Sequence, residues 1–397
     1  MKYDFSSIID RTGKDALAVE MIPFPDAQIA EGFSRIPMWV ADMNFATVPT
    51  IQQHIIERAK HPTFGYYNLS SEYYESIINW HATRNDAKNL TSEDIGYENG
   101  VLGCIASALQ AFTAPGDAVL LHAPAYIGFT RTLEENGRKI ILSDLKKDAD
   151  GIWRMDYEDM DRKLAKHQIH FVILCSPHNP TGRVWTGKEL EQAMEIYRRH
   201  DCVVISDEIW SDLLLNNYRH IPTQSISEDA RNRTIAVYAP SKTFNLAGLI
   251  GAYHIVYHPY LRDRLRKQSS LGHYNYMNVL SMHALIGAYS PEGREWVDEL
   301  RTVLTANVDF AYRFIREHFK GVELAKPQGT YMLYLDCGEW CRTHGCTLDD
   351  LIRAGIHVGV IWQDGRPFHK PDTIRMNLAL PYSLVVEAFD RLKKYVF

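Results

Sequence analysis

Residues 239–245 read Ala-Pro-Ser-Lys-Thr-Phe-Asn and place one lysine among small, polar and turn-forming residues, directly after the apolar run 234–238 (TIAVY). The run predicts a buried strand, and the residues after it predict a turn at the strand's carboxyl end. Ligands collect at such edges of parallel sheets. An amine held there can lose its hydration and stay partly neutral, as a Schiff-base nucleophile requires. Lys242 is therefore the first candidate catalytic residue.

Two further polar motifs follow apolar runs upstream. Residues 176–182 (SPHNPTG) come after the run 170–175, and their prolines stiffen a loop that can hold the Asn179 amide in one direction. Asp207 and Glu208 come after the run 202–206. Taken alone, the first motif is an ordinary turn asparagine. The two acids could be solvated, but a carboxylate directly after a buried apolar strand is more often a site residue. Because the carboxyl ends of parallel strands meet at one edge, the three motifs together predict a single crevice.

Short apolar runs alternate with helical stretches through the middle of the chain, at 118–121, 170–175, 202–206, 234–238 and 252–257. Continuous apolarity is typical of strands buried on both faces, as in parallel sheets. A chain of 397 residues is longer than one core usually organises. The sequence thus predicts an α/β protein with a mostly parallel central sheet. The large domain is expected over 51–289, and a smaller α+β domain is expected from 1–50 together with 290–397.

Local signals predict several helix ends. Thr186 followed by Glu189 is a capping box for a helix over 187–200. Ser290 before Pro291 predicts the start of a long helix, for which Gly321 is a plausible stop. A strand-like run follows at 329–335, and a final amphipathic helix is expected from about Leu384.

Composition and charge exclude several classes of function. The formal net charge is −6 and no basic block occurs, which argues against nucleic acid as a partner. No apolar run has the length of a membrane span or a signal-peptide core, so a cytoplasmic enzyme is expected. The spacing of Cys337, Cys341, His344 and Cys346 fits no common paired zinc pattern, so no metal site is predicted.

The motifs SPHNPTG, SDEIW (206–210) and SKTFNLAG (241–248), in this order, resemble those of the fold-type I pyridoxal-phosphate enzymes related to aspartate aminotransferase. The similarity extends to MWVADM at 38–43, HPTFGYY at 61–67, GYENGVLG at 96–103, GTYMLYLDC at 329–337 and RMNLALP at 375–381. Together these resemble the MalY/PatB branch, the cystathionine β-lyase or C–S lyase group, over nearly the whole chain.

The resemblance implies how the ring of pyridoxal phosphate is held. Lys242 carries the cofactor as an imine, and Asp207 pairs with the pyridine nitrogen. Asn179 donates to the phenolic oxygen, and Tyr126 stacks on the ring. From the residues alone, Tyr126 could equally be a core aromatic. An acid beside the pyridine nitrogen keeps the ring protonated, which lets it accept electrons from the substrate.

The resemblance also assigns the phosphate and the subunit arrangement. The backbone amides of Val101 and Leu102 hold the phosphate, as does Ser241. Tyr66 reaches the phosphate from the neighbouring subunit, which implies a homodimer. The residues 100–103 (GVLG) precede an apolar helix, whose free amides and dipole suit an anion, although an ordinary helix start would look the same.

Arg375 is assigned by the resemblance to the substrate α-carboxylate. It lies in a strand-like run, where an unpaired charge would be costly, and a planar fork matched to a carboxylate removes that cost. The alternative is a structural ion pair. Trp39, Trp210, Trp362 and Tyr382 are candidates for the side-chain pocket or for plain packing. His178, His254 and His273 are candidate acids for the leaving group or hydrogen-bonded structural histidines.

Four positions depart from the pattern of many aminotransferases, which carry an arginine eight residues after the lysine, where this chain has Ile250. Trp210 stands where a tyrosine is common, and Ala239 stands where a phosphate-binding serine is common. The family's usual aspartate in ADMDF is Asn44. These changes leave the detailed phosphate contacts open, and they weaken the interpretation as a plain aminotransferase.

The resemblance favours a β-C–S lyase that acts on cystathionine or another cysteine S-conjugate and yields pyruvate, ammonia and a thiol. Aminotransferases and racemases share the same lysine, ring and carboxylate clamp, so both remain alternatives. A pyridoxal-phosphate protein that acts mainly as a regulator is a third. The retained lysine, aspartate and arginine favour an enzyme over a regulator.

Overall fold

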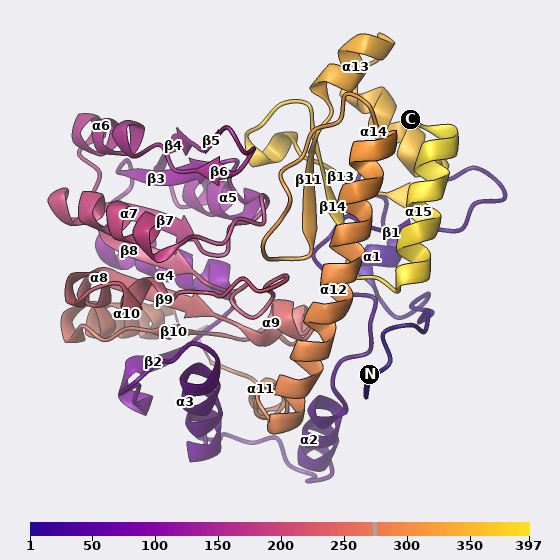
Figure 1. The fold of residues 1–397 in the computed structure, drawn as a ribbon. Helices are drawn as coiled ribbons and strands as arrows, with labels where there is room; N and C mark the ends of the chain where they lie inside the picture. The colour runs from indigo at the N-terminus through magenta and orange to yellow at the C-terminus, as the bar shows by residue number, and fades with distance from the viewer. Residues whose placement is uncertain (273–275) are drawn as a thin grey trace.

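The computed structural model describes residues 1–272 and 276–397, and its largest element is a central sheet (Figure 1). The seven strands run in the order β2-β10-β9-β8-β7-β3-β4. Their bounds are β2 Ile95–Glu98, β3 Ala118–Ala123, β4 Lys139–Asp144, β7 Phe171–Cys175, β8 Val203–Asp207, β9 Thr234–Tyr238 and β10 Ala252–Ile255. Strands β3, β4, β7, β8 and β9 are parallel to one another. The expected α/β fold with a mostly parallel sheet is confirmed.

One edge of the sheet differs from the expectation. β10 runs antiparallel to both β9 and β2, although its sequence has the continuous apolarity that predicts a parallel strand. All four of its residues are buried, and burial on both faces produces that pattern whichever way the strand runs. β2 and β4 lie outside the apolar runs, since both contain polar or half-exposed residues.

Helices cover both faces of the sheet. One face packs on α4 Val101–Phe112, α5 Ile127–Glu135 and α10 Pro259–Gly272, and the other on α6 Tyr157–His167, α7 Gly187–Arg199 and α8 Glu228–Arg233. Within β7, Ile173 belongs to the first core and Val172 and Leu174 to the second, which is the alternation of a strand buried on both sides. The predicted capping box of α7 is present, with Thr186 and Glu189 bonding reciprocally.

The C-terminal part forms a second layer beside this sheet (Figure 1). It contains an antiparallel sheet of β11 Met332–Asp336, β14 Thr373–Asn377 and β13 Gln363–Asp364. Against it lie α12 Pro291–His318, α13 Gly338–His344, α14 Leu348–His357 and α15 Tyr382–Tyr395. The Ser290 hydroxyl accepts from the Gly293 amide at 3.1 Å, so the predicted start of α12 is confirmed. The helix ends three residues before Gly321, which has a φ of +82°.

The N-terminal segment packs on this C-terminal layer. β1 Ile36–Pro37 pairs in parallel with β12 Val360–Ile361, and both chain ends lie on that side of the molecule (Figure 1). The segment then continues into α2 Pro49–Ala59, which packs on α11 Val279–Ala288. The division at 50 and 290 stays a prediction, because the main core runs through both parts.

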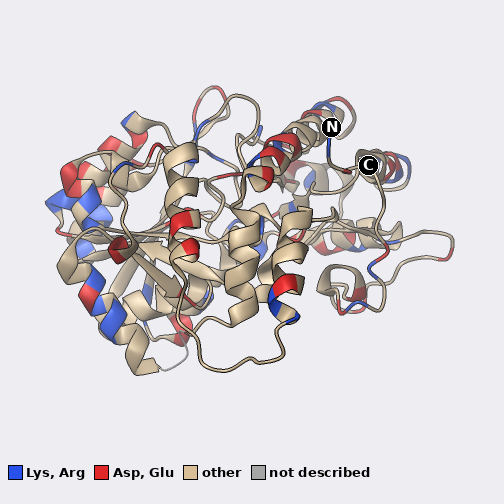
Figure 2. Cartoon of the chain, turned by 90° about the horizontal axis from the view of Figure 1, so that it is seen from below, with Lys and Arg blue, Asp and Glu red and all other residues tan. Residues whose placement is uncertain are grey.

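Further elements are the helix α3 Ser71–Arg84, the short helices α1 Leu17–Glu20 and α9 Pro240–Thr243, and the two-stranded ribbon of β5 Lys146–Lys147 with β6 Trp153–Arg154. Acidic and basic residues are interspersed over the helices (Figure 2). Within the described residues, no helix combines the length and apolarity needed to cross a membrane.

Candidate active site

A cavity of about 420 Å³ lies at the carboxyl ends of β7, β8 and β9. Its lining includes Trp39 and all the residues that the resemblance assigns to the cofactor or the substrate, except Tyr66: Val101, Leu102, Tyr126, Asn179, Asp207, Ser241, Lys242 and Arg375. The register explains the convergence, because Cys175 pairs with Asp207 and Asp207 with Val237. The three strands therefore end level, and the residues that follow them meet at one edge.

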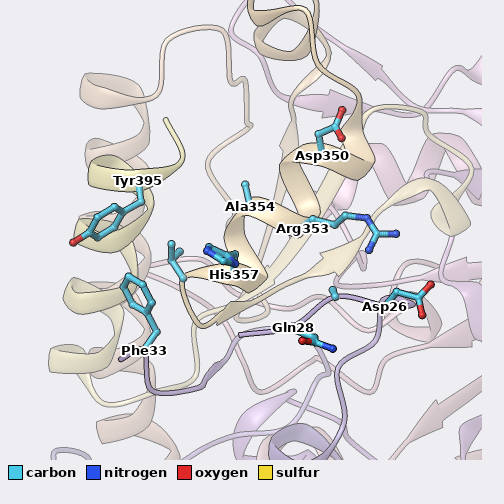
Figure 3. Close-up of a pocket in the computed structure, with 10 residues that line it drawn as sticks. Asp26, Gln28, Phe33, Asp350, Arg353, Ala354, His357 and Tyr395 are labelled. Carbon is cyan, nitrogen blue, oxygen red and sulfur yellow. The ribbon is translucent and has the colours of Figure 1, made fainter. Parts of the chain in front are cut away.

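A larger hollow of about 640 Å³ on the surface contains none of these motif residues. It lies between the N-terminal segment and α14, with Asp26, Gln28, Arg353 and His357 around it (Figure 3). Volume does not locate the site, because another hollow, of about 750 Å³ beside His54, Arg58 and His283, is larger still and also holds none of the predicted site residues. The chemistry gathers in the smaller cavity, which is the candidate active site.

Lys242 lies on α9, one turn after β9, and its Nζ donates to the Ala41 carbonyl at 3.2 Å. Burial, and after it the charge of Arg375, lower the pKa of Lys242 to about 8, while Asp42 and Asp207 oppose the shift. At pH 7 about one-tenth of such an amine is neutral, against less than about a thousandth of an ordinary lysine. The site thus provides the nucleophilic amine that the sequence predicts.

Asp207 and Glu208 are adjacent but have different surroundings. Asp207 lines the cavity, and burial raises the pKa of its carboxyl to about 7, although the Ile209 amide, which donates at 3.1 Å, and the Lys242 charge act the other way. Glu208 turns into the core, where Tyr238 and His220 bind Oε2 at 2.6 Å and the Thr223 amide donates to Oε1 at 3.0 Å. Glu208 therefore supports the strand end, and Asp207 alone faces the site.

Arg375 is fully buried on β14 and reaches across to the loop after β7. Its Nη1 donates to the Asn179 Oδ1 at 3.1 Å, and its Nη2 donates to the Trp39 carbonyl at 3.3 Å and to Gln363. The Nε has no partner among the described residues. Burial lowers the pKa of Arg375 to about 10. Because its hydrogen-bond acceptors are amide and carbonyl oxygens rather than a carboxylate, the guanidinium can still pair with an anion.

Gln363 is a site residue that the sequence analysis missed. It lines the cavity and lies opposite Arg375 in the pairing of β13 with β14. A neutral glutamine after an apolar Trp362 carries no local signal. Only the pairing of two strands brings it against the arginine.

The first turn of α4 faces the cavity with Val101 and Leu102. Gly100 precedes it with a φ of +79°, a conformation that favours glycine. The amides of a first helical turn have no partners within their helix, so they remain available to an anion. The turn predicted from GVLG to hold the phosphate therefore lines the cavity, and its phosphate role stays a prediction.

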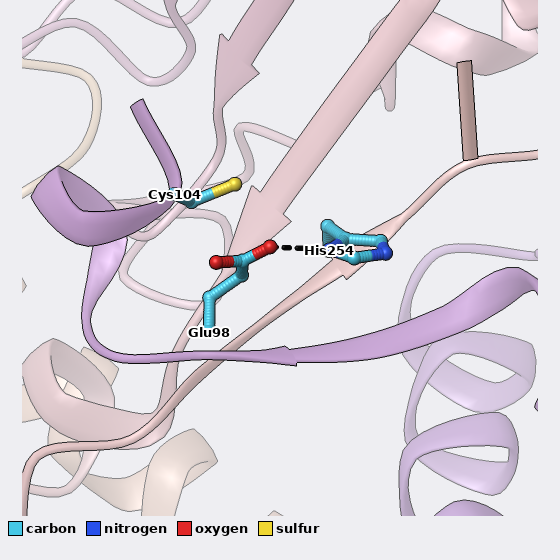
Figure 4. A group of neighbouring side chains, drawn as sticks. All are labelled: Glu98, Cys104 and His254. Carbon is cyan, nitrogen blue, oxygen red and sulfur yellow. Dashed lines mark hydrogen bonds and ion pairs between the residues drawn. The ribbon is translucent and has the colours of Figure 1, made fainter. Parts of the chain in front are cut away.

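Behind this turn lies a fully buried trio of Glu98, Cys104 and His254 (Figure 4). Glu98 Oε1 and His254 Nδ1 are hydrogen-bonded at 2.8 Å, and the Gly100 amide donates to the Glu98 carbonyl at 2.9 Å. The pair ties the end of β2 to β10 just before this turn begins. His254 is thus a supporting residue outside the cavity lining, and not a leaving-group acid.

Tyr126 caps the start of α5, and its ring packs edge-on to Phe129 at 5.3 Å. Gly128 makes room for it, since a Cβ there would lie 2.5 Å from the ring. Burial raises the pKa of the Tyr126 hydroxyl, which keeps the ring neutral. The position suits a flat aromatic partner.

The other aromatic and histidine candidates fall into two groups, those that line the cavity and those that lie outside it. Trp39 and Trp210 line the cavity, whereas Trp362 donates to the Ile352 carbonyl in the core and Tyr382 lies outside. Burial lowers the pKa of His178 to about 3, so it is neutral, and its Nδ1 is hydrogen-bonded to Thr181 at 2.8 Å. His273 lies outside the described residues.

The departures from the aminotransferase pattern also fall at the cavity. Ile250 and Ala239 both line it, and Lys242 Nζ is 6.0 Å from the centre of the Trp210 ring. Ile250 is half exposed and has a φ of +35°, which is unusual for a β-branched residue. Lys242 and Arg375 are the only cationic side chains in the lining among the described residues.

Comparison with known proteins identifies the family. The profile of Aminotransferase class I and II matches residues 38–392. The chain belongs to this family. It is 35% identical to cystathionine beta-lyase PatB of Bacillus subtilis over 301 residues, which cover 76% of this chain and 77% of that protein.

Two solved structures are similar over their whole length. The PLP-bound putative aminotransferase of Clostridium difficile has a TM-score of 0.90 and 32% identity, with all of both chains covered. The PLP-bound C-S lyase of Staphylococcus hominis has a TM-score of 0.89 and 28% identity, covering 100% of this chain and 98% of that one. The fold of the family is confirmed.

Proposed function

We propose that this protein is a pyridoxal-phosphate-dependent C–S β-lyase. It cleaves cystathionine or a related cysteine S-conjugate into pyruvate, ammonia and a thiol. The observation that carries the proposal is a buried lysine of lowered pKa in one cavity with Asp207 and Arg375. The lyase names of PatB and of the Staphylococcus hominis enzyme support the choice of reaction.

The cavity fits the cofactor. Lys242 offers an amine with a single backbone acceptor, and it would hold the aldehyde covalently. Asp207 would pair with the pyridine nitrogen, Asn179 would bond the phenolic oxygen, and Tyr126 would lie against the ring. The amides of Val101 and Leu102 with Ser241 would hold the phosphate. We assign these roles because the residues line one cavity from several strand and helix ends, with Val101 and Leu102 on α4 and Ser241 and Lys242 on α9.

When bound, pyridoxal phosphate supplies an electron sink for negative charge at the substrate Cα. Arg375 binds the α-carboxylate through its fork and so fixes the direction of the Cα–H bond. Lys242, as a neutral amine, takes the Cα proton. Departure of a thiolate from Cβ completes the elimination, and the unsaturated amine that remains hydrolyses to pyruvate and ammonia. Trp39 and Trp210 wall the cavity and limit water.

Incubation of the holoenzyme with cystathionine, with and without a 2-oxo acid, tests this reaction. Pyruvate, ammonia and thiol released in equal amounts without the oxo acid support the lyase. The second candidate is an aminotransferase, which the name of the Clostridium difficile structure favours. Absolute dependence on the oxo acid selects that candidate. Conversion of an L-amino acid to its D-form, followed by chiral chromatography, would select a racemase.

The active enzyme is a homodimer in this proposal. Tyr66 is fully exposed on the loop between α2 and α3 and lies outside the lining of its own cavity, so it is free to reach the phosphate bound by a partner. Mixed dimers test the arrangement. An equimolar mixture of Lys242→Ala and Tyr66→Ala subunits should regain about a quarter of the wild-type activity, because about half of the dimers are hybrids and one of the two sites in each hybrid is intact. Full activity in a monomer, measured by light scattering, contradicts it.

We also propose that the enzyme is cytoplasmic. We propose further that residues 51–289 form its large domain and that residues 1–50 and 290–397 together form its small domain. All six cysteines are free thiols, as is typical of a reducing compartment. Cell fractionation tests the location. Limited proteolysis tests the domain boundaries, because a protease should first cut the chain near residues 50 and 290 if the division is right.

A further inference from the structure

Three cysteines gather around the short helix α13. Cys337 precedes the helix, and the Cys341 amide donates to its carbonyl at 2.9 Å. At the other end Gly345 has a φ of +64°, and the Cys346 amide donates to the Cys341 carbonyl at 3.1 Å. A bond from the second residue beyond a helix to its fourth-last residue is the Schellman ending, which commonly brings the two side chains into contact. Here both side chains are thiols.

The thiols of this pair interact and differ in exposure. Cys341 is buried, whereas Cys346 is only partly so. Burial first, and then the charge and hydrogen bond of Cys346, raise the pKa of the Cys341 thiol to about 11. Cys346 is therefore the thiol that a reagent in solution can reach, and Cys341 lies on the buried side of Cys346. Neighbouring residues of this kind are the arrangement of an attacking and a resolving cysteine.

A zinc site is less consistent with the same geometry. The His344 ring stacks on Trp340 at 4.4 Å, and its Nδ1 is hydrogen-bonded to the Trp340 carbonyl at 2.9 Å. The imidazole is thus already held by its neighbour four residues back. The close thiol pair remains as the reactive feature.

We propose that Cys341 and Cys346 form a reversible disulfide by exchange with a low-molecular-weight disulfide. The Cys346 thiolate attacks one sulfur of the reagent, so a mixed disulfide forms and one thiolate leaves. The Cys341 thiolate then attacks the Cys346 sulfur, which closes the protein disulfide and releases the second thiolate. Two protein thiols lose two electrons, the reagent is reduced to two thiols, and the protons go to those thiols. An excess of a small thiol reverses both steps.

The inference is independent of the proposed reaction, since it involves no substrate and no residue of the cavity. Bonding two residues that already touch requires little movement, so the fold is retained. Cross-linking restricts the unfolded chain, so the oxidised protein should melt at a higher temperature than the reduced protein.

Oxidised glutathione is the probe, applied to the purified holoenzyme. Intact mass should show the loss of two hydrogen atoms, and trypsin should release the peptides 321–342 and 343–353 joined by a bond that dithiothreitol breaks. Cys341→Ser should stop at a stable glutathione adduct on Cys346. Cys346→Ser should form neither species, and its melting temperature should not respond to oxidation. Cys202→Ser, whose thiol lies in the core between the sheet and α7, should behave as wild type.

Three results would overturn the inference. One is a wild-type protein that accumulates only the Cys346 adduct. Another is a bond within peptide 321–342, which would join Cys337 to Cys341 instead. The third is persistence of the cross-link in Cys341→Ser, which would show that Cys337 is the partner. If Cys346→Ser folds poorly, Cys346→Ala provides the same comparison.

Discussion

Lys242 differs from a surface lysine in its burial and in the charges around it, and both affect how it reacts. With a pKa of about 8, its neutral fraction should rise about tenfold per pH unit up to pH 8 and then level off. Covalent capture of pyridoxal phosphate by the apoprotein should follow this profile. Borohydride reduction at timed intervals, followed by intact mass, measures it. A rate that keeps rising to about pH 10 would mean an ordinary lysine, and Lys242→Arg should give no adduct.

Arg375 offers two nitrogens to oxygen partners and keeps its Nε unbonded among the described residues. Lysine cannot reproduce a planar fork. Arg375→Lys should therefore lower kcat/KM by about 10- to 100-fold, mainly through KM, because a hydrogen bond to a charged group contributes about 1.5–3 kcal/mol. Steady-state kinetics with cystathionine measures it.

Arg366→Lys is the matched control, since Arg366 is half exposed and pairs with Asp364 and Asp349 outside the cavity. It should leave kcat/KM within about twofold, because exposed ion pairs contribute little. Equal losses in the two variants would count against a specific role for Arg375.

At the scale of elements, the pairing of β2 with β10 depends on Gly96. Gly96 lies opposite His254, and a Cβ at Gly96 would come within 2.2 Å of the imidazole. Gly96→Ala should destabilise the protein by about 1–3 kcal/mol through overpacking. Urea unfolding measures the loss. Gly103→Ala is the control, since its Cβ would meet only Asn99 at 3.6 Å.

A double variant separates the clash from other effects of Gly96→Ala. Removing the ring with His254→Ala makes space for the added methyl, although it also takes a partner from Glu98. The double variant should therefore lose less stability than the two single losses added together. Strict additivity would show that the imidazole is not what the methyl meets.

Among the local features of the fold, helix ends were the easiest to predict from the sequence. The capping box at Thr186 and the Ser290 cap were both read from neighbouring residues, and both bonds are present. The direction of β10 could not be predicted from the sequence. Its apolar run indicates burial on both faces but carries no information about whether the neighbouring strands run parallel or antiparallel to it.

At the scale of the whole molecule, buried histidines make stability depend on pH. Burial lowers the pKa of His81 and His178 to about 3 and of His122 to about 4, from an ordinary 6.5. These groups favour the folded state above pH 6.5, and that contribution is lost as pH falls. Asp207 acts oppositely, because its pKa is raised from 3.8 to about 7 and its contribution is lost as pH rises through 7.

Between pH 5 and 6 the three histidines take up protons on unfolding while Asp207 releases one, which leaves a net uptake of two. The apoprotein should therefore lose about 2.5 kcal/mol of unfolding free energy per pH unit on acidification. Urea titrations across this range measure the slope. His122→Gln should reduce it by about half, and an unchanged slope in that variant would refute the assignment.

The sequence by itself determined the cofactor chemistry of this protein. Lys242, Asp207 and Asn179 each follow an apolar run, and in a parallel sheet the order of such runs is enough to bring their ends together. Only the tertiary structure decided that Gln363 lies against Arg375, that Glu208 turns into the core while Asp207 faces the cavity, and that β10 reverses direction. Those outcomes depend on strand register and on packing between residues far apart in the chain, which no local run of amino acids specifies.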